Sequence, residues 1–216
     1  MSWTLFQLLV TGALVTAGIS AVSVVAGLGL GVLVCAASLA PGRAVRLAAA
    51  VYVSFFRGVP LLVQLLLLYH VLPRLGVDLP GVVAAVLGLT LCTAAYQAET
   101  LRGGFVNVAP GLVEAGRMVG LSARQILLRI RAPIALRLVL PAVVNEAILI
   151  LKASSLVSVV GVADLTRTAQ TIASSTYRPI EAFAVAGALY LALNIAVGGA
   201  GAGLGRLLGG GVARGR

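Results

Sequence analysis

Charged and metal-binding residues are scarce in this chain of 216 residues. It contains one lysine, one histidine, two cysteines and six acidic residues, and only 10% of its residues are charged. Cys35 and Cys92 each fall within an apolar run without a second cysteine nearby, so neither a disulfide framework nor a zinc site is predicted. The single histidine, His70, has no GxSxG or HExxH segment to support hydrolysis. The sequence therefore predicts neither an enzyme nor a metal site.

Phosphate-binding motifs and aromatic residues are also lacking. The only lysine, Lys152, lies outside any GxxxxGK segment, and no set of glycines completes GxGxxG, so the chain is not expected to bind a nucleotide by itself. The net charge of +10 could indicate nucleic acid, but aromatic residues make up only 5% of the chain and are not interleaved with the basic ones. We predict no nucleic-acid partner and no cofactor bound by this chain.

Apolar residues dominate instead, at 60% of the sequence and a mean hydropathy of +1.09. Runs close to the ~20 residues that a bilayer requires cover residues 11–39, 59–75, 80–101, 138–160 and 182–204. We therefore predict an all-α transmembrane fold with about five membrane-spanning helices, forming a single domain over residues 1–216. No segment is long or polar enough for a separate soluble domain, so soluble activities must come from partner chains.

Glycines recur at four-residue spacing within two of these runs. Gly27 and Gly31 form one pair, and the second set lies at positions 199, 201, 203 and 205. This spacing allows helix backbones to approach each other closely in lipid. We interpret both sets as helix-packing positions.

The distribution of basic residues predicts how the chain crosses the membrane. With the N-terminus outside and the C-terminus in the cytoplasm, the cytoplasmic segments hold twelve of the sixteen basic residues: Arg43, Arg46, Arg57, Arg102, Arg117, Arg124, Arg129, Arg131, Arg137, Arg206, Arg214 and Arg216. The outer segments hold Arg74, Arg167 and Arg178, together with Asp78, Asp164 and Glu181. The positive-inside rule favours this orientation in a lipid membrane.

The most polar part of the chain is residues 106–137, between the third and fourth predicted spans. Residues 107–110 interrupt the helix, residues 111–119 can form a short helix, and Gly120 permits a sharp turn. Ser122 is a plausible N-cap for a second short helix over 123–131, which Pro133 is expected to end. This cytoplasmic element has an apolar and a basic face, so it could lie on the lipid surface or enter a groove on another protein.

This cytoplasmic loop resembles that of the membrane subunits of bacterial ATP-binding cassette (ABC) importers. Their loop carries Glu-Ala-Ala, a glycine four residues later, and Ile-x-Leu-Pro. Five residues match: Glu114, Ala115, Gly120, Ile130 and Pro133. Gly116 replaces the second alanine and Ala132 replaces the leucine.

Three further segments resemble the polar amino acid permease branch of this family, in the same order. They are FFRGVPLLVQLLLLY at 55–69, AAYQAETLRGGF at 94–105 and LKASSLVSVVGVADLT at 151–166. The family pattern would have glutamine at Leu112 and Asp-Thr at Ala153 and Ser154. The resemblance covers nearly the whole chain and is to permeases of the histidine, glutamine and arginine type.

The resemblance implies a permease subunit of a type I-like ABC importer for polar amino acids in the bacterial inner membrane. Its implied partners are a second permease subunit, an external solute-binding protein and two cytoplasmic ATPases, which would hold ATP and Mg²⁺. The coupling loop would be formed by Glu114, Ala115, Gly116, Gly120, Ile130 and Pro133, with Glu114 anchoring the ATPase contact. From the residues alone, Glu114 could also simply stabilise the start of a helix through its dipole.

Two further groups of polar residues are candidate sites near or within the spans. Arg57, Gly58 and Pro60 are either a cytoplasmic anchor or part of a gate, because a break there exposes backbone groups. Glu99 and Arg102 are spaced for an ion pair on one helix face, as a structural pair or a substrate ligand.

The fourth span carries the candidate translocation pathway: Asn145, Glu146, Lys152 and Ser155. Asn145, Lys152 and Ser155 share a polar stripe by helical spacing, and Glu146 is displaced from it. Charged groups within a span usually face a cavity or a partner. Glu146 and Lys152 therefore either contact substrate or hold a partner subunit in register.

Two other function classes compete with the importer interpretation. A secondary, ion-coupled transporter would need a midplane ion site and commonly shows two repeated halves, which five unequal spans do not. An intramembrane enzyme would need paired catalytic residues at similar depth. An ABC importer subunit for a different small polar solute is the third alternative.

Overall fold

The structure, a computed structural model, describes residues 3–207 and contains no strand over that range. Two arginines assigned to the cytoplasmic side, Arg214 and Arg216, lie outside it. The elements are α1 (Trp3–Ser38), α2 (Arg43–Gly58), α3 (Leu61–Val71), η1 (Pro73–Leu75), α4 (Gly81–Val106), α5 (Pro110–Met118), α6 (Ala123–Ile126), η2 (Leu127–Arg131), α7 (Ala132–Ala153), η3 (Ser154–Val160), α8 (Leu165–Thr176) and α9 (Pro179–Leu207).

Four stretches are long and apolar enough to cross a membrane: Trp3–Ser38, Gly81–Val106, Ala123–Val160 and Pro179–Leu207. A fifth span is possible as a bent pair, Arg43–Gly58 with Leu61–Leu75, whose two halves meet at 104°. This confirms the predicted all-α membrane fold and its number of spans.

The predicted bounds of the second span, 59–75, are wrong. α3 has 11 residues, which is about 16 Å of helix and too short to cross a bilayer. The preceding α2 supplies the rest, and the break lies at Val59, which is extended with φ −93° and ψ 132°. Pro60 causes it, because a proline ring disfavours the α conformation of the residue before it.

The predicted helix end at Pro133 is also wrong. α6 continues through η2, a π-helix, into α7 without a break. Within this passage the amide of Ala132 donates to the carbonyl oxygen of Leu127, five residues back. Because Pro133 has no N–H to donate, the helix accommodates it by a local π-turn rather than by ending.

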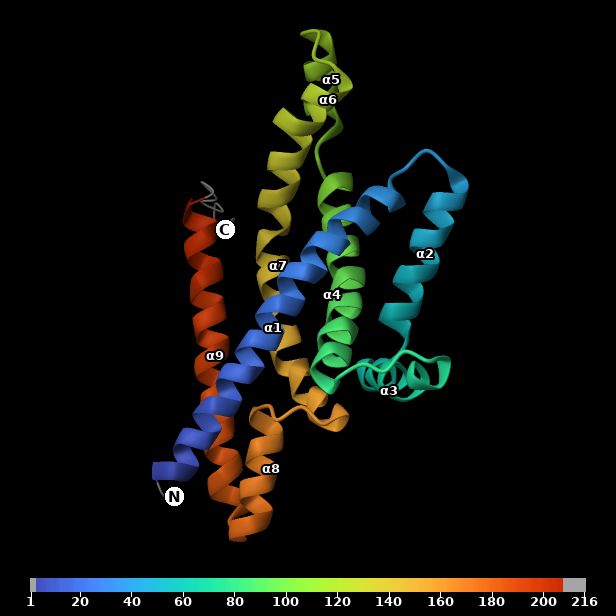
Figure 1. Cartoon of the computed structure of the whole chain (residues 1–216). Helices are drawn as coiled ribbons and strands as arrows, with labels where there is room; N and C mark the ends of the chain where they lie inside the picture. Colours follow the sequence, from blue (N-terminus) through green and yellow to red (C-terminus); the bar gives the residue numbers. More distant parts are fainter. Residues whose placement is uncertain (1–2, 208–216) are drawn as a thin grey trace.

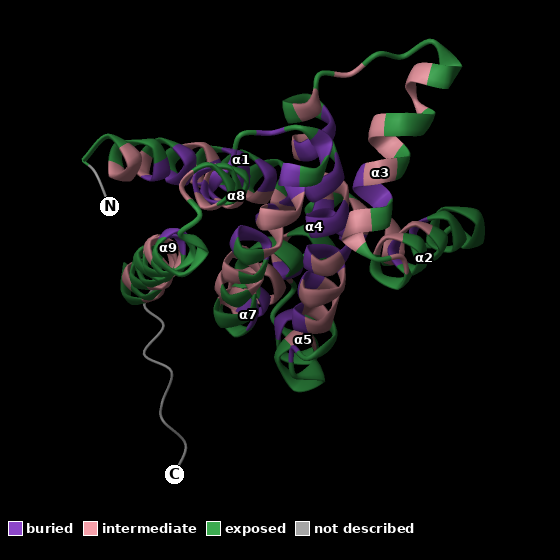
Figure 2. Cartoon of the chain, turned by 90° about the horizontal axis from the view of Figure 1, so that it is seen from below, coloured by how far each residue is buried: buried purple, intermediate pink, exposed green. Residues whose placement is uncertain are grey.

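α4 lies at the centre of the molecule and is its most buried long helix (Figure 2). α1 crosses it at the predicted glycine pair. A Cβ atom on Gly27 would lie 2.6 Å from Cβ of Thr93, and one on Gly31 would lie 2.9 Å from Cβ of Gln97. The first glycine set is therefore a packing surface, as predicted.

In the second glycine set, Gly201 packs against α7. A Cβ atom there would meet Val144 at 2.4 Å, whereas Gly199 and Gly203 face open space. Half of the predicted packing surface on α9 is thus confirmed within the described chain.

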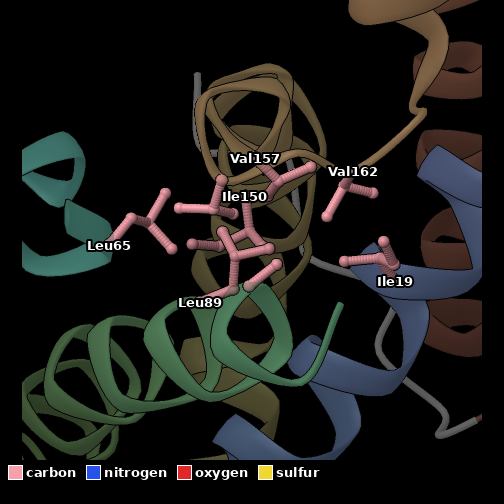
Figure 3. Close-up of a cluster of buried hydrophobic side chains, with 8 residues drawn as sticks. Ile19, Leu65, Leu89, Ile150, Val157 and Val162 are labelled. Atoms are coloured by element: carbon pink, nitrogen blue, oxygen red, sulfur yellow. The ribbon is translucent and has the colours of Figure 1, made fainter. Parts of the chain in front are cut away.

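A cluster of buried apolar side chains holds the broken span against α4. Leu65 of α3 meets Leu89 of α4, and the cluster continues across the chain to Ile19, Ile150, Val157 and Val162 (Figure 3). Leu65 also lies over Gly88, where a Cβ atom would be 2.7 Å from Cδ2 of the leucine. The short α3 therefore keeps its place through packing rather than through length.

The two ends of the molecule differ in character (Figure 1). α5 and α6 project at one end, and the beginning of α1 lies with α8 at the other. α9 runs from the α8 end back toward the α5 end.

Gly27→Val is expected to lower the melting temperature of the chain in detergent by several degrees. Overpacking a close helix contact costs about 1–3 kcal/mol, and the added atoms would collide with Thr93. Gly29→Val is the matched control, because nothing lies within 4 Å of a Cβ atom there. Equal melting temperatures for the two variants would contradict the packing role of Gly27.

Candidate coupling element and intramembrane polar site

The projecting element consists of α5, a turn at Gly120 and α6. Gly120 has φ +79°, and its amide donates to the carbonyl oxygen of Arg117 at 3.0 Å. This left-handed position explains the glycine, which carries no Cβ penalty there. Ser122 caps α6 as predicted, in a reciprocal pair with Gln125: the Gln125 amide donates to Ser122 Oγ at 3.3 Å, and the Ser122 amide donates to Gln125 Oε1 at 2.8 Å.

α5 folds back onto the α6–η2 helix at Gly116. Gly116 is buried, and a Cβ atom there would lie 2.8 Å from Cδ1 of Ile130 and 3.3 Å from Cγ1 of Ile126. The glycine thus lets α5 sit closer to this helix than an alanine would. The Ile130 side chain packs against α5 at Gly116. Pro133 is half-buried at the start of α7.

The outer face of α5 has no cover within the described chain. Glu114 and Ala115 are exposed, and the Glu114 carboxylate makes neither a hydrogen bond nor an ion pair with residues 3–207. Beyond them, Met118 and Val119 are 88% and 75% exposed. We call Glu114, Arg117, Met118 and Val119 the coupling tip. A carboxylate beside two exposed large apolar side chains is suited to a protein partner.

The break between α2 and α3 is stabilised by a residue that sequence reasoning missed. Gln64 is 2% exposed. Its Nε2 donates to the carbonyl oxygens of Phe56 at 2.9 Å and Val59 at 2.7 Å. These carbonyls are left without helical partners by the break, and in lipid each would be costly to leave unbonded. An isolated glutamine four residues after a proline, in an apolar run, was the available signal.

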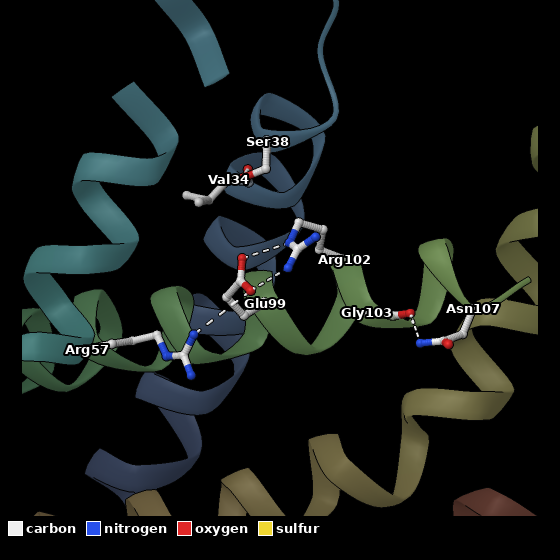
Figure 4. A network of polar contacts seen from close by, with 7 residues as sticks. All are labelled: Val34, Ser38, Arg57, Glu99, Arg102, Gly103 and Asn107. Carbon is white, nitrogen blue, oxygen red and sulfur yellow. Dashed lines mark hydrogen bonds and ion pairs between the residues drawn. The ribbon is translucent and has the colours of Figure 1, made fainter. Parts of the chain in front are cut away.

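The predicted Glu99–Arg102 pair is present on α4 (Figure 4). Nε and Nη2 of Arg102 donate to the two carboxylate oxygens of Glu99, each at 2.9 Å. Arg57 approaches from the end of α2, with its Nη1 atom 3.9 Å from Oε2 of Glu99 and its guanidinium 5.2 Å from the ring centroid of Tyr96. The Glu99 carboxylate therefore pairs with two arginines, and its pair with Arg57 links the broken span to α4.

A polar pocket of about 440 Å³ adjoins this network. Its polar lining is Ser38, Arg46, Ser54, Arg57, Glu99 and Arg102. The Arg46 side chain is fixed at the α1–α2 turn by hydrogen bonds to two backbone carbonyls, at 2.9 and 2.7 Å. With three guanidinium groups and one carboxylate, the pocket is suited to a small anionic or zwitterionic group.

The candidate pathway residues are only partly brought together. Asn145 and Lys152 are exposed on α7, and Glu146 is half-buried. Ser155 lies beyond the end of α7, in η3, so the predicted polar stripe does not extend to it. No ion pair joins Glu146 and Lys152 within the described chain.

A second polar cluster, also missed, ties α8 to α1 and α9. Asp164 is fully buried and caps α8, accepting hydrogen bonds from the amides of Thr166 at 3.1 Å and Arg167 at 2.9 Å. The Tyr190 hydroxyl of α9 lies 3.4 Å from the same carboxylate. Thr16 of α1 accepts from the next amide, that of Leu165, at 3.1 Å.

Burial raises the pKa of Asp164, and the hydrogen bonds from Arg167, Thr166 and Tyr190 act in the opposite direction. The pKa of Asp164 is therefore higher in the folded chain than in the unfolded chain. Its protonation contributes fully to the free energy of unfolding at a pH below the pKa of the unfolded chain. This contribution is lost as the pH rises through the pKa of the folded chain. The helix cap formed by Asp164 stabilises the fold independently of this titration, because its oxygens accept the two amide hydrogen bonds.

We expect Asp164→Ala to destabilise the chain by about 1–2 kcal/mol, because two helix-start amides lose their acceptor. Asp164→Asn retains an acceptor oxygen, so it should destabilise the chain less than Asp164→Ala does. The asparagine variant also has no carboxyl group to titrate, so its melting temperature should rise relative to that of the wild type as the pH increases above about 4, the ordinary pKa of an aspartate. Parallel melting curves for the wild type and the asparagine variant across this range would contradict the raised pKa.

Comparison with known proteins supplies the family. A family model described as "Binding-protein-dependent transport system inner membrane component" matches residues 23–208. The nopaline transport system permease protein NocM of Agrobacterium fabrum is 40% identical over 186 residues, covering 82% of this chain and 77% of NocM. The glutamine transport system permease protein GlnP of Escherichia coli is 34% identical over 195 residues, 89% of each chain.

Solved structures agree with the sequence relatives. The crystal structure of an amino acid ABC transporter with histidines matches with a TM-score of 0.87 at 34% identity, covering 93% of this chain and 94% of that one. The inward-facing MetNI methionine ABC transporter shares the fold, with a TM-score of 0.78 at 24% identity over 96% of this chain and 99% of that one. The chain therefore belongs to the inner membrane components of binding-protein-dependent transport systems, as an ABC importer permease of the amino-acid type.

Proposed function

We propose that this chain transports polar amino acids into the cell, as one of two permease subunits driven by separate cytoplasmic ATPases. ATP and Mg²⁺ would be bound by the ATPases, because this chain lacks a phosphate-binding loop. The observation that carries the proposal is the coupling tip. It presents a carboxylate without a partner in the described chain, in the segment that resembles the coupling loop of ABC importer permeases.

The coupling tip is linked to the candidate pathway by the packing of α5 on a helix that continues into α7. α5 packs on the α6–η2 segment at Gly116, and that segment runs directly into α7. A movement of the ATPases would therefore reach Asn145 and Glu146 on α7 without crossing a flexible loop. This is the rigid-lever arrangement that alternating access requires.

The gate is the second part of this mechanism. Arg57 of α2 forms an ion pair with Glu99 of α4, and it sits beside the break formed by Gly58 and Pro60. Motion of α2 relative to α4 would make or break this pair. A charge pair of this kind can favour one of two helix arrangements at a time.

We infer that the α5 end faces the cytoplasm, with the N-terminus outside and the C-terminus inside, in the inner membrane of a bacterium. The arginines of the α5–α7 segment support this orientation, because positive charge concentrates on the cytoplasmic side. Their positions are Arg117, Arg124, Arg129, Arg131 and Arg137.

A second permease subunit, identical or related, and an external solute-binding protein would complete the transporter. Asn145 and Lys152 are exposed on a membrane-spanning helix, which is unfavourable against lipid and indicates a partner subunit or a water-filled path. Lys152 and Ser155 remain pathway candidates on this basis. The family description, which names binding-protein dependence, supports the external partner.

The substrate class rests on the relatives and on the chemistry of the polar site. The relatives compared above are named for glutamine and nopaline transport. An amino acid carries an ammonium and a carboxylate, and Glu146 with the Arg57–Glu99–Arg102 network offers groups of both signs. We therefore propose a zwitterionic amino acid with a polar side chain as the substrate.

Glu114→Lys should abolish copurification of the ATPase when the chain is isolated from its own host in mild detergent. Reversing the charge at the centre of a docking surface costs several kcal/mol of binding, well over a hundredfold in affinity. The readout is the ATPase band and ATP hydrolysis in the eluted complex.

Asp78→Lys is the matched control, since Asp78 is an equally exposed carboxylate in the segment before α4. This variant should copurify the ATPase as the wild type does. ATPase binding by the Glu114→Lys variant at the wild-type level would remove the proposed coupling contact.

A further inference from the structure

An apolar groove lies at the coupling end of the molecule, on a different set of surfaces from the polar pocket. It has a volume of about 480 Å³ and is formed by the last turns of α1 and α4 together with the η2–α7 junction. Its walls include Val32, Ala36, Leu101, Phe105, Leu127 and Leu136. The only charged residue among the lining side chains is Arg131.

Arg131 has fewer partners than its chemistry requires. It is half-buried, and its Nη2 atom donates one hydrogen bond, to the carbonyl oxygen of Phe105 at 3.3 Å. It forms no ion pair with residues 3–207, where the carboxylates of the ion pairs are Glu99 and Glu181. A guanidinium group carries five N–H donors, and a charge held against apolar walls without a counter-ion is unfavourable.

The exposed apolar side chains of the groove favour an apolar ligand, just as the unpaired Arg131 guanidinium favours an anionic one. Val32, Leu127 and Leu136 are 49%, 42% and 51% exposed although they line the groove. A soluble anion would leave these side chains without an apolar partner in the groove, and a purely apolar partner would bury an unpaired charge. An anionic phospholipid meets both requirements.

We propose that this groove binds an anionic phospholipid, with an acyl chain against α1 and α4 and the phosphate on the Arg131 guanidinium. Charge complementarity favours an anionic headgroup, because Arg124 and Arg129 are exposed on the same helical segment. Each added basic residue near a membrane surface strengthens attraction to anionic lipid. The proposal is independent of ATPase docking, because no residue of the coupling tip lines the groove.

The location gives the lipid a role in coupling. Leu127 and Arg131 are the first and last residues of η2, and both line the groove. A lipid bound there contacts both ends of the π-turn that joins the coupling element to α7. Anionic lipid would thus stabilise the helix geometry through which the ATPases move α7.

The test is native mass spectrometry of the full-length chain, delipidated in mild detergent and then supplied with phosphatidylglycerol or phosphatidylcholine. We expect the wild type to retain one phosphatidylglycerol in preference to phosphatidylcholine. Arg131→Gln should reduce phosphatidylglycerol retention about tenfold, the effect of losing a charged hydrogen bond. Arg74→Gln, which removes an exposed arginine of η1, outside the groove and the helical segment that forms it, should retain the lipid.

A second pair of variants tests the acyl-chain site without altering charge. Ala36→Phe narrows the groove from α1 and should also lower retention, whereas Ala26→Phe lies on α1 outside the groove and should not. Equal retention of the two lipids by the wild type, or unchanged retention by both Arg131→Gln and Ala36→Phe, would overturn the proposal. Copurification of the ATPase is measured separately. A failure of the lipid proposal can therefore be distinguished from a failure of the proposed ATPase contact.

Discussion

The close approach of helix backbones to α4 is the constraint on which the rest of this structure depends. Lipid provides no hydrophobic force between helices, so their association relies on van der Waals packing at small residues. Gly27 and Gly31 bring α1 against one side of α4, Gly88 receives Leu65 of α3, and Gly104 lies close to Val139 of α7. Once these contacts are made, α4 carries Glu99 to a position between two arginines. The polar network is thus a consequence of the packing.

Three of the six carboxylates of the chain are partly or fully buried among its helices. Glu99 joins α2 to α4, Asp164 caps α8 against α1 and α9, and Glu146 is half-buried on α7. Glu114 differs from these three, because it faces outward at the coupling tip. In a membrane protein with only six acidic residues, an exposed and unpaired carboxylate is more informative than it would be on a soluble surface.

Hydropathy and spacing predicted the helical membrane fold, the α1 packing surface, the Glu99–Arg102 pair and the Ser122 cap, because each depends on neighbouring residues in sequence. The effects of the two prolines could not be predicted in the same way. Pro60 ends a helix because Gln64 can bond the freed carbonyls, whereas the helix passes Pro133 because it widens at η2. Asp164 could be assigned from the sequence only to an outer segment, because its contact with Tyr190 depends on the tertiary fold.

The π-turn at η2 sets the direction in which the coupling tip points. An α-helix turns about 100° for each residue, so a turn that absorbs one additional residue rotates everything before it by that angle about the helix axis. α5 and Glu114 therefore face where they do because of residues 127–131, on which α5 packs through Gly116. The segment therefore sets the rotation of the coupling element about the axis of α7. Adding or removing one residue in it would turn the same docking residues toward a different direction.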